Sequence, residues 1–235
     1  MIRLGLLGLW VLAGSAQAAP TVEDTMAQRV LACTGCHGPQ GRAASDGYYP
    51  RIAGKPAGYL YQQLLSFRDG RRQYTLMANL LAPLTDDYLR EIAAHFSQLE
   101  LPYAPPQPAT AGVVALTRGE ALVNKGDAAL RVPACIQCHG AALMGVAPGV
   151  PALIGMPRDY LNAQLGAWRA GSRHAMSPDC MAEVAQRLAP SDISALSQYL
   201  AAQTVPLGAK PAASLPAPLP LPCGSAPARV PGSPK

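Results

Sequence analysis

Two short segments of the chain carry the same reactive pattern. The sequence reads "CTGCH" over residues 33–37 and "CIQCH" over residues 135–139, so each time two cysteines three positions apart are followed directly by a histidine. This pattern is the attachment signature of c-type haem. The thiols form thioethers with the haem vinyl groups, and the histidine is then placed to ligate the iron. The sequence therefore predicts two covalently bound haem c groups.

The two predicted sites are built alike. The first comprises Cys33, Cys36 and His37, and the second comprises Cys135, Cys138 and His139. A CxxC redox pair or half of a zinc site is the alternative interpretation. Neither alternative explains why a histidine directly follows each cysteine pair, so we favour haem attachment.

The N-terminus predicts export. Residues 1–18, "MIRLGLLGLWVLAGSAQA", contain one basic residue, an apolar stretch and an A-x-A pattern, which together are typical of a cleaved signal peptide. The apolar run is shorter than the roughly 20 residues that span a bilayer. We therefore expect a periplasmic mature chain that begins near Ala19, and haem attachment takes place in this same exported compartment.

The charge of the chain excludes one class of partner. Loss of Arg3 with the signal peptide lowers the formal net charge from +5 to +4. This charge is small and forms no Lys/Arg cluster, so nucleic acid is not an expected partner.

The two motifs belong to a tandem repeat. Residues 50–70 and 151–171 align without a gap at an offset of 101 positions, with recurring Pro, Gly, Tyr, Leu, Gln and Arg residues. We infer a duplicated domain. The predicted organisation is a first domain over 19–100, a Pro-rich linker over 101–112, a second domain over 113–204 and a Pro-rich tail over 205–235. The tail lacks apolar periodicity and is predicted to be mostly disordered.

The pattern within each copy is helical. A helix could begin at Thr21 and run into the first motif, and apolar residues within 60–67 share one face of a helix that Gly70 can end. Thr85 is a candidate N-cap for the next helix, and Ser191 begins the equivalent helix of the second copy. No segment alternates in the manner of a strand, so we predict an all-α fold. Domains this small would draw much of their core from a bound cofactor.

At this point the sequence resembles the diheme cytochrome c4 family, over roughly residues 21–203. The resemblance rests on the paired "CHG", on the "PRIAGKPAGYLYQQL" block with its second copy, and on the segment from a methionine to "LTDD". It implies two tandem class I cytochrome c domains, each with a His/Met-ligated iron. It also implies that Pro50 and Pro151 offer backbone carbonyls to the ring N–H groups of the two motif histidines.

The second protein ligand of each haem iron, opposite the histidine, is simple to predict in the first domain and ambiguous in the second. Met77 is the only methionine between Gly70 and Thr85. The corresponding loop of the second domain has three additional residues and offers Met181, Met176 and His174. Counted back from the following helix, Met77 lies seven residues before Leu84 and Met181 lies seven residues before Leu188, so we favour Met181.

The remaining candidates have plainer expected roles. Cys180 and Cys223 are the two cysteines outside the motifs, and we predict a disulfide between them; free thiols or bonding to a partner chain are the alternatives. His95, Met26, Met144 and Met156 are expected to pack or lie at the surface. Arg68, Arg71, Arg72, Arg169 and Arg173 could neutralise haem propionates or be solvated charges at helix ends.

The resemblance implies an electron-transfer protein with no substrate chemistry of its own. It would carry electrons from a dehydrogenase or quinol-oxidising complex to a terminal oxidase or other acceptor, and any membrane association would come through these partners. Two alternatives are a haem enzyme, peroxidase-like or thiosulfate-oxidising, and a dedicated cytochrome subunit of a dehydrogenase complex. An enzyme would need an iron with an open position, and "HAMSPDCM" over 174–181 is where the ligand ambiguity would allow one.

Overall fold

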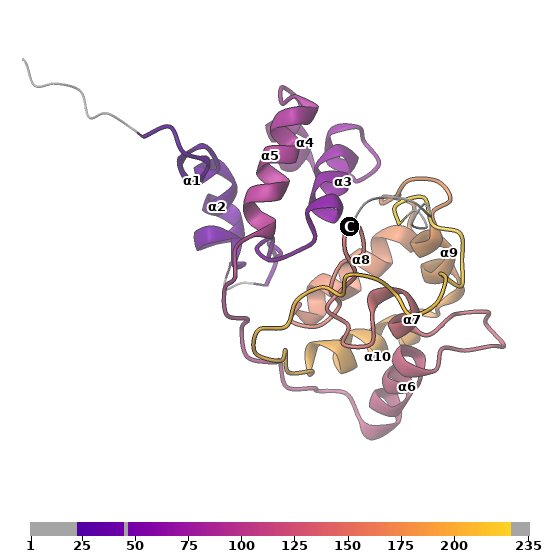
Figure 1. Ribbon diagram of the computed structural model, residues 1–235. Coiled ribbons are helices and arrows are strands. Elements are labelled where there is room, and N and C mark those ends of the chain that lie inside the picture. The colour runs from indigo at the N-terminus through magenta and orange to yellow at the C-terminus, as the bar shows by residue number, and fades with distance from the viewer. Residues whose placement is uncertain (1–22, 45–46, 227–235) are drawn as a thin grey trace, which may run out of the picture.

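The chain was analysed as a computed structural model, which describes residues 23–44 and 47–226 (Figure 1). The predicted signal peptide over 1–18 lies outside the described residues. The first half contains α1 (Met26–Arg29), α2 (Leu31–His37), α3 (Ala57–Arg68), α4 (Thr75–Leu81) and α5 (Asp86–Ser97). The second half contains α6 (Val113–Asn124), α7 (Cys135–His139), α8 (Arg158–Arg169), α9 (Cys180–Arg187) and α10 (Pro190–Ala201). Over these residues the fold is all-α, as predicted, and only isolated bridge pairs of extended backbone occur.

Two predicted helix starts differ from the structure. The first helix begins at Met26 instead of Thr21, because the Thr25 hydroxyl accepts a hydrogen bond from the Gln28 N–H and caps it. The last helix begins at Pro190 instead of Ser191. There the Asp192 carboxylate accepts the Ala189 N–H at 3.2 Å, and the proline ring suits the first helical position.

Other local predictions are confirmed. The Thr85 hydroxyl accepts the Tyr88 N–H at 3.3 Å and caps α5. Gly70 follows the end of α3 with φ +78°, a left-handed conformation that glycine adopts without steric cost. The apolar face of α5 then packs into the first domain, where Leu89 is fully buried.

Each half of the chain has its own apolar core. The first core comprises Val30, Leu60, Leu81, Leu89, Ile92, Ala93 and Phe96. The second core lies among α6, α8 and α10 and includes Leu122, Val123, Leu161, Leu196 and Leu200. Because the two clusters are separate, the structure divides the chain as the repeat predicts.

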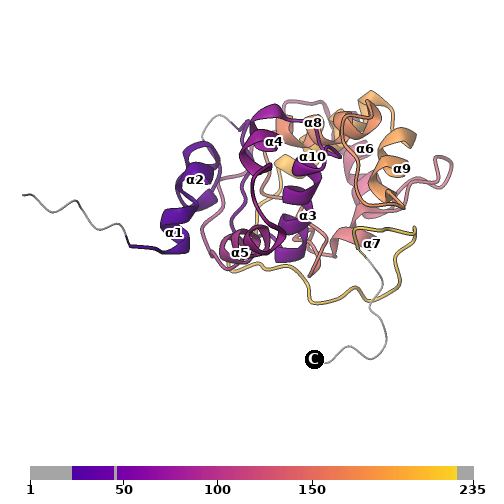
Figure 2. The ribbon, with the colours of Figure 1, turned by 90° about the horizontal axis from the view of Figure 1, so that it is seen from above.

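The two halves meet through equivalent residues. Arg72 donates to Gln63 at 3.1 Å within its own half and to Gln164 at 2.5 Å in the other half. Arg173, the counterpart of Arg72 at an offset of 101, donates to Gln164 at 2.5 Å and to Gln63 at 2.9 Å. An antiparallel backbone bridge pairs Arg72 with Arg173. The repeats are therefore related by a local two-fold arrangement, with α3 facing α8 (Figures 1 and 2).

The tail is ordered over its described part, so the prediction of a mostly disordered tail was wrong for residues 205–226. Ala212 exchanges backbone hydrogen bonds with Gly145 and Ala147, at 2.9 and 2.8 Å. Farther along, a disulfide joins Cys223 to Cys180, and this is the pairing we predicted. The yellow segment in Figures 1 and 2 follows this path along the second domain. Backbone hydrogen bonds and the disulfide therefore hold the tail in place, although its sequence has no apolar periodicity.

Removing this disulfide should destabilise the second domain. The Cys180→Ala/Cys223→Ala variant opens a loop whose ends are 43 residues apart, and the chain-entropy relation predicts a loss of up to about 4 kcal/mol in the free energy of unfolding. Denaturant unfolding of the haem-loaded protein measures it.

Lys210→Ala is the matched control in the same tail, because it removes an exposed ion pair with Glu100 and should cost no more than about 1 kcal/mol. Equal effects of the two changes would contradict the expectation.

Candidate functional site

Both motif histidines are buried, and a backbone carbonyl oxygen lies within hydrogen-bond distance of each ring. His37 ends α2, and its Nδ1 lies 2.8 Å from the Pro50 oxygen. His139 ends α7, and its Nδ1 lies 2.8 Å from the Pro151 oxygen. The expected role of the two prolines is thereby confirmed. Since each Nδ1 is engaged, each Nε2 remains as the nitrogen that can bind a metal.

Burial also sets the protonation of these rings. Desolvation lowers the pKa of His37 and of His139, although the hydrogen bond to each proline carbonyl acts in the opposite direction. A lowered pKa means that the neutral imidazole prevails at pH 7. The neutral ring is the form that ligates a metal.

A glycine after each histidine turns the chain back toward the ring. Gly38 has φ +75° and Gly140 has φ +81°. After Gly38, the Ala43 N–H donates to the His37 oxygen at 2.8 Å, and the chain returns to Pro50. A Cβ on Gly38 would lie 2.2 Å from the Ala43 oxygen, so no other residue fits without moving this loop. At Gly38, the close approach of the returning loop therefore requires glycine. At Gly140 a Cβ would lie 3.3 Å from the nearest atom, and the positive φ is what favours glycine there.

The four motif cysteines differ in exposure. Cys36 is exposed and the other three are half-buried. Burial raises the pKa of Cys33 and Cys138, and it raises that of Cys135 to about 12. Desolvation therefore disfavours the thiolate form at Cys33, Cys135 and Cys138. The described residues contain no group of three or more His, Cys, Asp or Glu side chains that could hold a metal ion.

The candidate methionines lie in different surroundings. Met77 is within α4 and packs against the apolar cluster that Cys33 also contacts. In the second domain Met181 occupies the first turn of α9, directly after the disulfide-bonded Cys180, and is half-buried. Met176 is 41% exposed, and His174 is also exposed. Met144 and Met156 are buried in the second core, as the packing prediction required.

Several cations gather where the two halves meet. Among the described residues, Arg72 and Arg173 form no ion pair with a carboxylate, whereas Arg71 pairs with Asp69 at 3.2 Å. Arg72 and Arg173 bond to glutamines, and Arg173 stacks on Trp168 with its guanidinium carbon 3.8 Å from the ring centroid. Nε of Arg71 and Nε1 of Trp168 are buried and have no hydrogen-bond partner among the described residues. Buried N–H donors are rarely left unpaired. These donors suit anionic groups, and the propionates of a haem are carboxylates.

Two other arginines considered for this role are engaged elsewhere. Arg68 forms an ion pair with Asp86 at 2.7 Å and donates to the Leu84 oxygen. Arg169 donates to the backbone oxygens of Gln186 and Leu188. Both arginines therefore brace the loops that precede α5 and α10.

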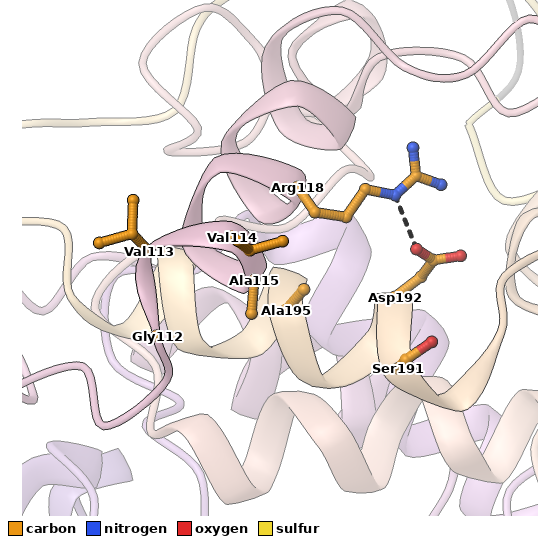
Figure 3. A pocket seen from close by; sticks show the side chains of 8 residues that line it. All are labelled: Gly112, Val113, Val114, Ala115, Arg118, Ser191, Asp192 and Ala195. Atoms are coloured by element: carbon orange, nitrogen blue, oxygen red, sulfur yellow. Dashed lines mark hydrogen bonds and ion pairs between the residues drawn. The ribbon is translucent and has the colours of Figure 1, made fainter.

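A surface pocket of about 470 Å³ lies apart from both motifs (Figure 3). It is lined by the start of α6 and the start of α10. Val113 and Val114 are strongly exposed there, and Arg118 donates to Asp192 at 2.8 Å. None of the motif residues lines this pocket. Among the described residues, no helix is both long and apolar enough to cross a membrane.

Two CxxCH segments, each with a buried histidine held by a proline carbonyl, define a c-type cytochrome. The family profile "Cytochrome c" matches residues 116–204, which is the second repeat. The chain is 33% identical to a cytochrome c4 of Pseudomonas aeruginosa, over 85% of this chain and 94% of that protein. It belongs to the cytochrome c4 family. Covalently bound haem c and a role in electron transfer are the properties that these relatives support.

Another relative and two solved structures are also similar to this chain. The chain is 37% identical to a thiosulfate dehydrogenase electron acceptor of Thiomonas intermedia, over 79% of this chain and 85% of that protein. The structure is similar to reduced cytochrome c4 from Pseudomonas stutzeri, with a TM-score of 0.64 and 30% identity over 76% of this chain and 96% of that one. It is also similar to a thiosulfate dehydrogenase from Marichromatium purpuratum, with a TM-score of 0.66 and 34% identity. There the match covers 75% of this chain but only 37% of the longer one.

The sequence reasoning missed two residues of the interface. Trp168 offers a buried N–H there, and Lys55 is buried against the other half of the chain. The offset of 101 could have suggested the glutamine–arginine pairs, because Gln63 recurs as Gln164. No such signal exists for Lys55, because its counterpart in the second repeat is Met156.

Replacing Gly38 should disturb the first histidine site more than a glycine change elsewhere. Gly38→Ala places a Cβ 2.2 Å from a backbone oxygen, whereas Gly70→Ala meets nothing within 4 Å at a similar φ of +78°. The control should lose about 1–2 kcal/mol from the left-handed backbone alone. Gly38→Ala should lose more, because the loop that carries the Pro50 carbonyl must move. Denaturant unfolding of the two variants measures the difference, and equal losses would argue against the steric requirement.

Proposed function

We propose that this chain is an exported diheme cytochrome that accepts electrons from a thiosulfate dehydrogenase and passes them to a further acceptor, such as a terminal oxidase. The observation that carries the choice of donor is the 37% identity to a thiosulfate dehydrogenase electron acceptor over most of both chains. The duplicated histidine geometry supports two haems of the same kind. The proposed boundaries are a first domain over 19–100 and a second over 113–204.

In the first site, Cys33 and Cys36 would hold the haem, and His37 and Met77 would ligate its iron. A bound haem supplies a one-electron couple. Pro50 keeps His37 oriented through the 2.8 Å hydrogen bond. α4 keeps Met77 on the same apolar cluster as Cys33. Two protein ligands leave no position for a substrate, so this site favours electron transfer.

In the second site, Cys135 and Cys138 would hold the haem, and His139 would be one ligand. Met181 is our choice for the other, with Met176 and His174 as alternatives. Two contacts anchor the start of α9. The Asp179 carboxylate accepts the Ala182 N–H at 3.0 Å, and the disulfide joins Cys180 to the tail. Met181 follows Cys180 directly, so its backbone is anchored better than that of the exposed Met176.

Separate faces would serve the donor and the acceptor. Lys and Arg balance Asp and Glu at eight each over residues 19–108, whereas residues 109–235 contain ten against six. Since surface charge steers the encounter of redox partners, this difference supports docking of different partners by the two halves. The predicted signal peptide supports placing the protein in the periplasm.

The match to part of a longer thiosulfate dehydrogenase chain favours a second candidate, a dedicated subunit of such an enzyme. In that case the same haems would work within a permanent complex. Both candidates make the chain a recipient of electrons, and they differ from an enzyme that oxidises thiosulfate itself.

A reduction assay tests the proposal. The mature oxidised protein should carry two covalent haems by intact mass and stay oxidised when mixed anaerobically with thiosulfate alone. Addition of a catalytic amount of thiosulfate dehydrogenase should reduce both haems, which the absorbance spectrum follows. Reduction by thiosulfate without the dehydrogenase would identify an enzyme instead. Absence of reduction in both mixtures would exclude thiosulfate dehydrogenase as the donor.

Single methionine replacements test the ligands. The oxidised protein should show the near-infrared band of methionine-to-iron ligation for both haems. Met77→Ala should remove the contribution of the first haem, and Met181→Ala should remove that of the second. Met176→Ala is the matched control, because Met176 lies five residues before Met181, in the loop that leads into α9. Loss of the band in Met176→Ala but not in Met181→Ala would show that Met176 is the ligand.

A further inference from the structure

Lys55 is buried at the contact between the two halves. It is 6% exposed, and its Nζ lies 3.5 Å from the Sδ of Met156, which is itself 4% exposed. The two residues are equivalent at the repeat offset of 101. Lys55 therefore meets its own counterpart across the local two-fold arrangement.

The surroundings of Lys55 are poor in negative charge. Three arginines surround it with positive charge. Arg51 lies in the loop before α3, and the other two, Arg72 and Arg173, form the antiparallel bridge. The ring of Tyr59 on α3 lies 5.9 Å from Nζ, and Tyr160 on α8 also faces the amine. Among the described residues, no carboxylate pairs with Lys55, and a thioether is a weak acceptor. A permanently charged ammonium is therefore costly at this position.

The amine of Lys55 gains and loses its proton near neutral pH. Burial lowers its pKa to about 8, and the three arginines act in the same direction. Tyr160 acts in the opposite direction. The side-chain amine of lysine changes protonation readily when it is buried, whereas a guanidinium does not. Among the cations gathered here, Lys55 is thus the group that can lose its proton.

We propose that Lys55 binds and releases a proton in step with the redox state of the haems and so makes their reduction potentials depend on pH. This inference rests on the proposed function. When a haem takes one electron from its donor, the site becomes more negative by one charge, and Lys55 takes one proton from water. When the electron leaves to the acceptor, the proton returns to water.

The position of Lys55 explains why it responds to the haems. Arg72 and Arg173, whose positive charge acts on Lys55, belong to the donor set that suits haem propionates. Arg173 also stacks on Trp168, whose buried N–H is unpaired among the described residues. A charged Lys55 stabilises the reduced, more negative haem. A neutral Lys55 does not, so the reduction potential must fall as pH rises through the pKa of the amine.

The test is potentiometric titration of the haem-loaded protein between pH 6 and pH 10. In the wild type, the equilibrium constant for reduction should fall by up to tenfold per pH unit, which is about 59 mV for a one-electron couple.

Three variants separate charge from structure. Lys55→Arg keeps a charge that does not titrate, so the potentials should stay high and lose the Lys55 step. Lys55→Met recreates the residue of the other repeat, so the potentials should be low and also lose the step. Lys125→Met is the matched control, because Lys125 is exposed at the end of α6, and it should behave like the wild type.

The Lys55→Met/Met156→Lys exchange covers the case in which a single variant fails to fold. It moves the amine to the other side of the same contact and should restore the pH step. Two results would overturn the proposal. In one, the reduction potentials of Lys55→Arg and Lys55→Met change with pH as those of the wild type do. In the other, the potentials of the wild type do not change with pH. Such a result in a protein that carries two haems and accepts electrons from thiosulfate dehydrogenase would leave the proposed function intact.

Discussion

The hydrogen bond from a histidine ring to a proline carbonyl is the constraint around which each half of this protein is organised. At 2.8 Å in both halves, it orients the imidazole and leaves Nε2 for a metal. Several sequence features follow from it. The helix ends at the histidine, a glycine with positive φ follows, and the loop returns the proline to the ring. Burial keeps the ring neutral, which is the protonation state that ligation needs.

A second level of organisation comes from duplication. Two copies of this unit face each other through the same glutamine and arginine side chains, each arginine bonding to both glutamines. The arginines that bridge the two halves bond to neutral glutamines and not to carboxylates, which is unfavourable unless an anionic group joins them. The cytochrome c4 relatives bind haem, whose propionates supply negative charge. The interface that joins the domains therefore also suits the cofactor.

The sequence predicted most of the local structure, and its errors have clear causes. Thr85 was identified as an N-cap because a hydroxyl directly before an amphipathic run has few other roles. Ser191 was misjudged because Pro190 and Asp192 together start α10 one residue earlier. The tail was misjudged because its order comes from backbone bonds to Gly145 and Ala147 and from the disulfide, which leave no apolar period. The disulfide itself was predictable, since only two cysteines lie outside the motifs.

By itself, the sequence determined the chemistry of this protein: the CxxCH motifs, their glycines and the repeat offset are local patterns, and each demands particular residue types. The tertiary structure alone decided what happens where the copies meet. Lys55 and Met156 are 101 positions apart, and their contact depends on the packing of two domains against each other. The same packing leaves Arg71 and Trp168 with buried, unpaired N–H groups. Burial and the balance of charge are properties of the folded assembly, so no stretch of sequence could reveal them.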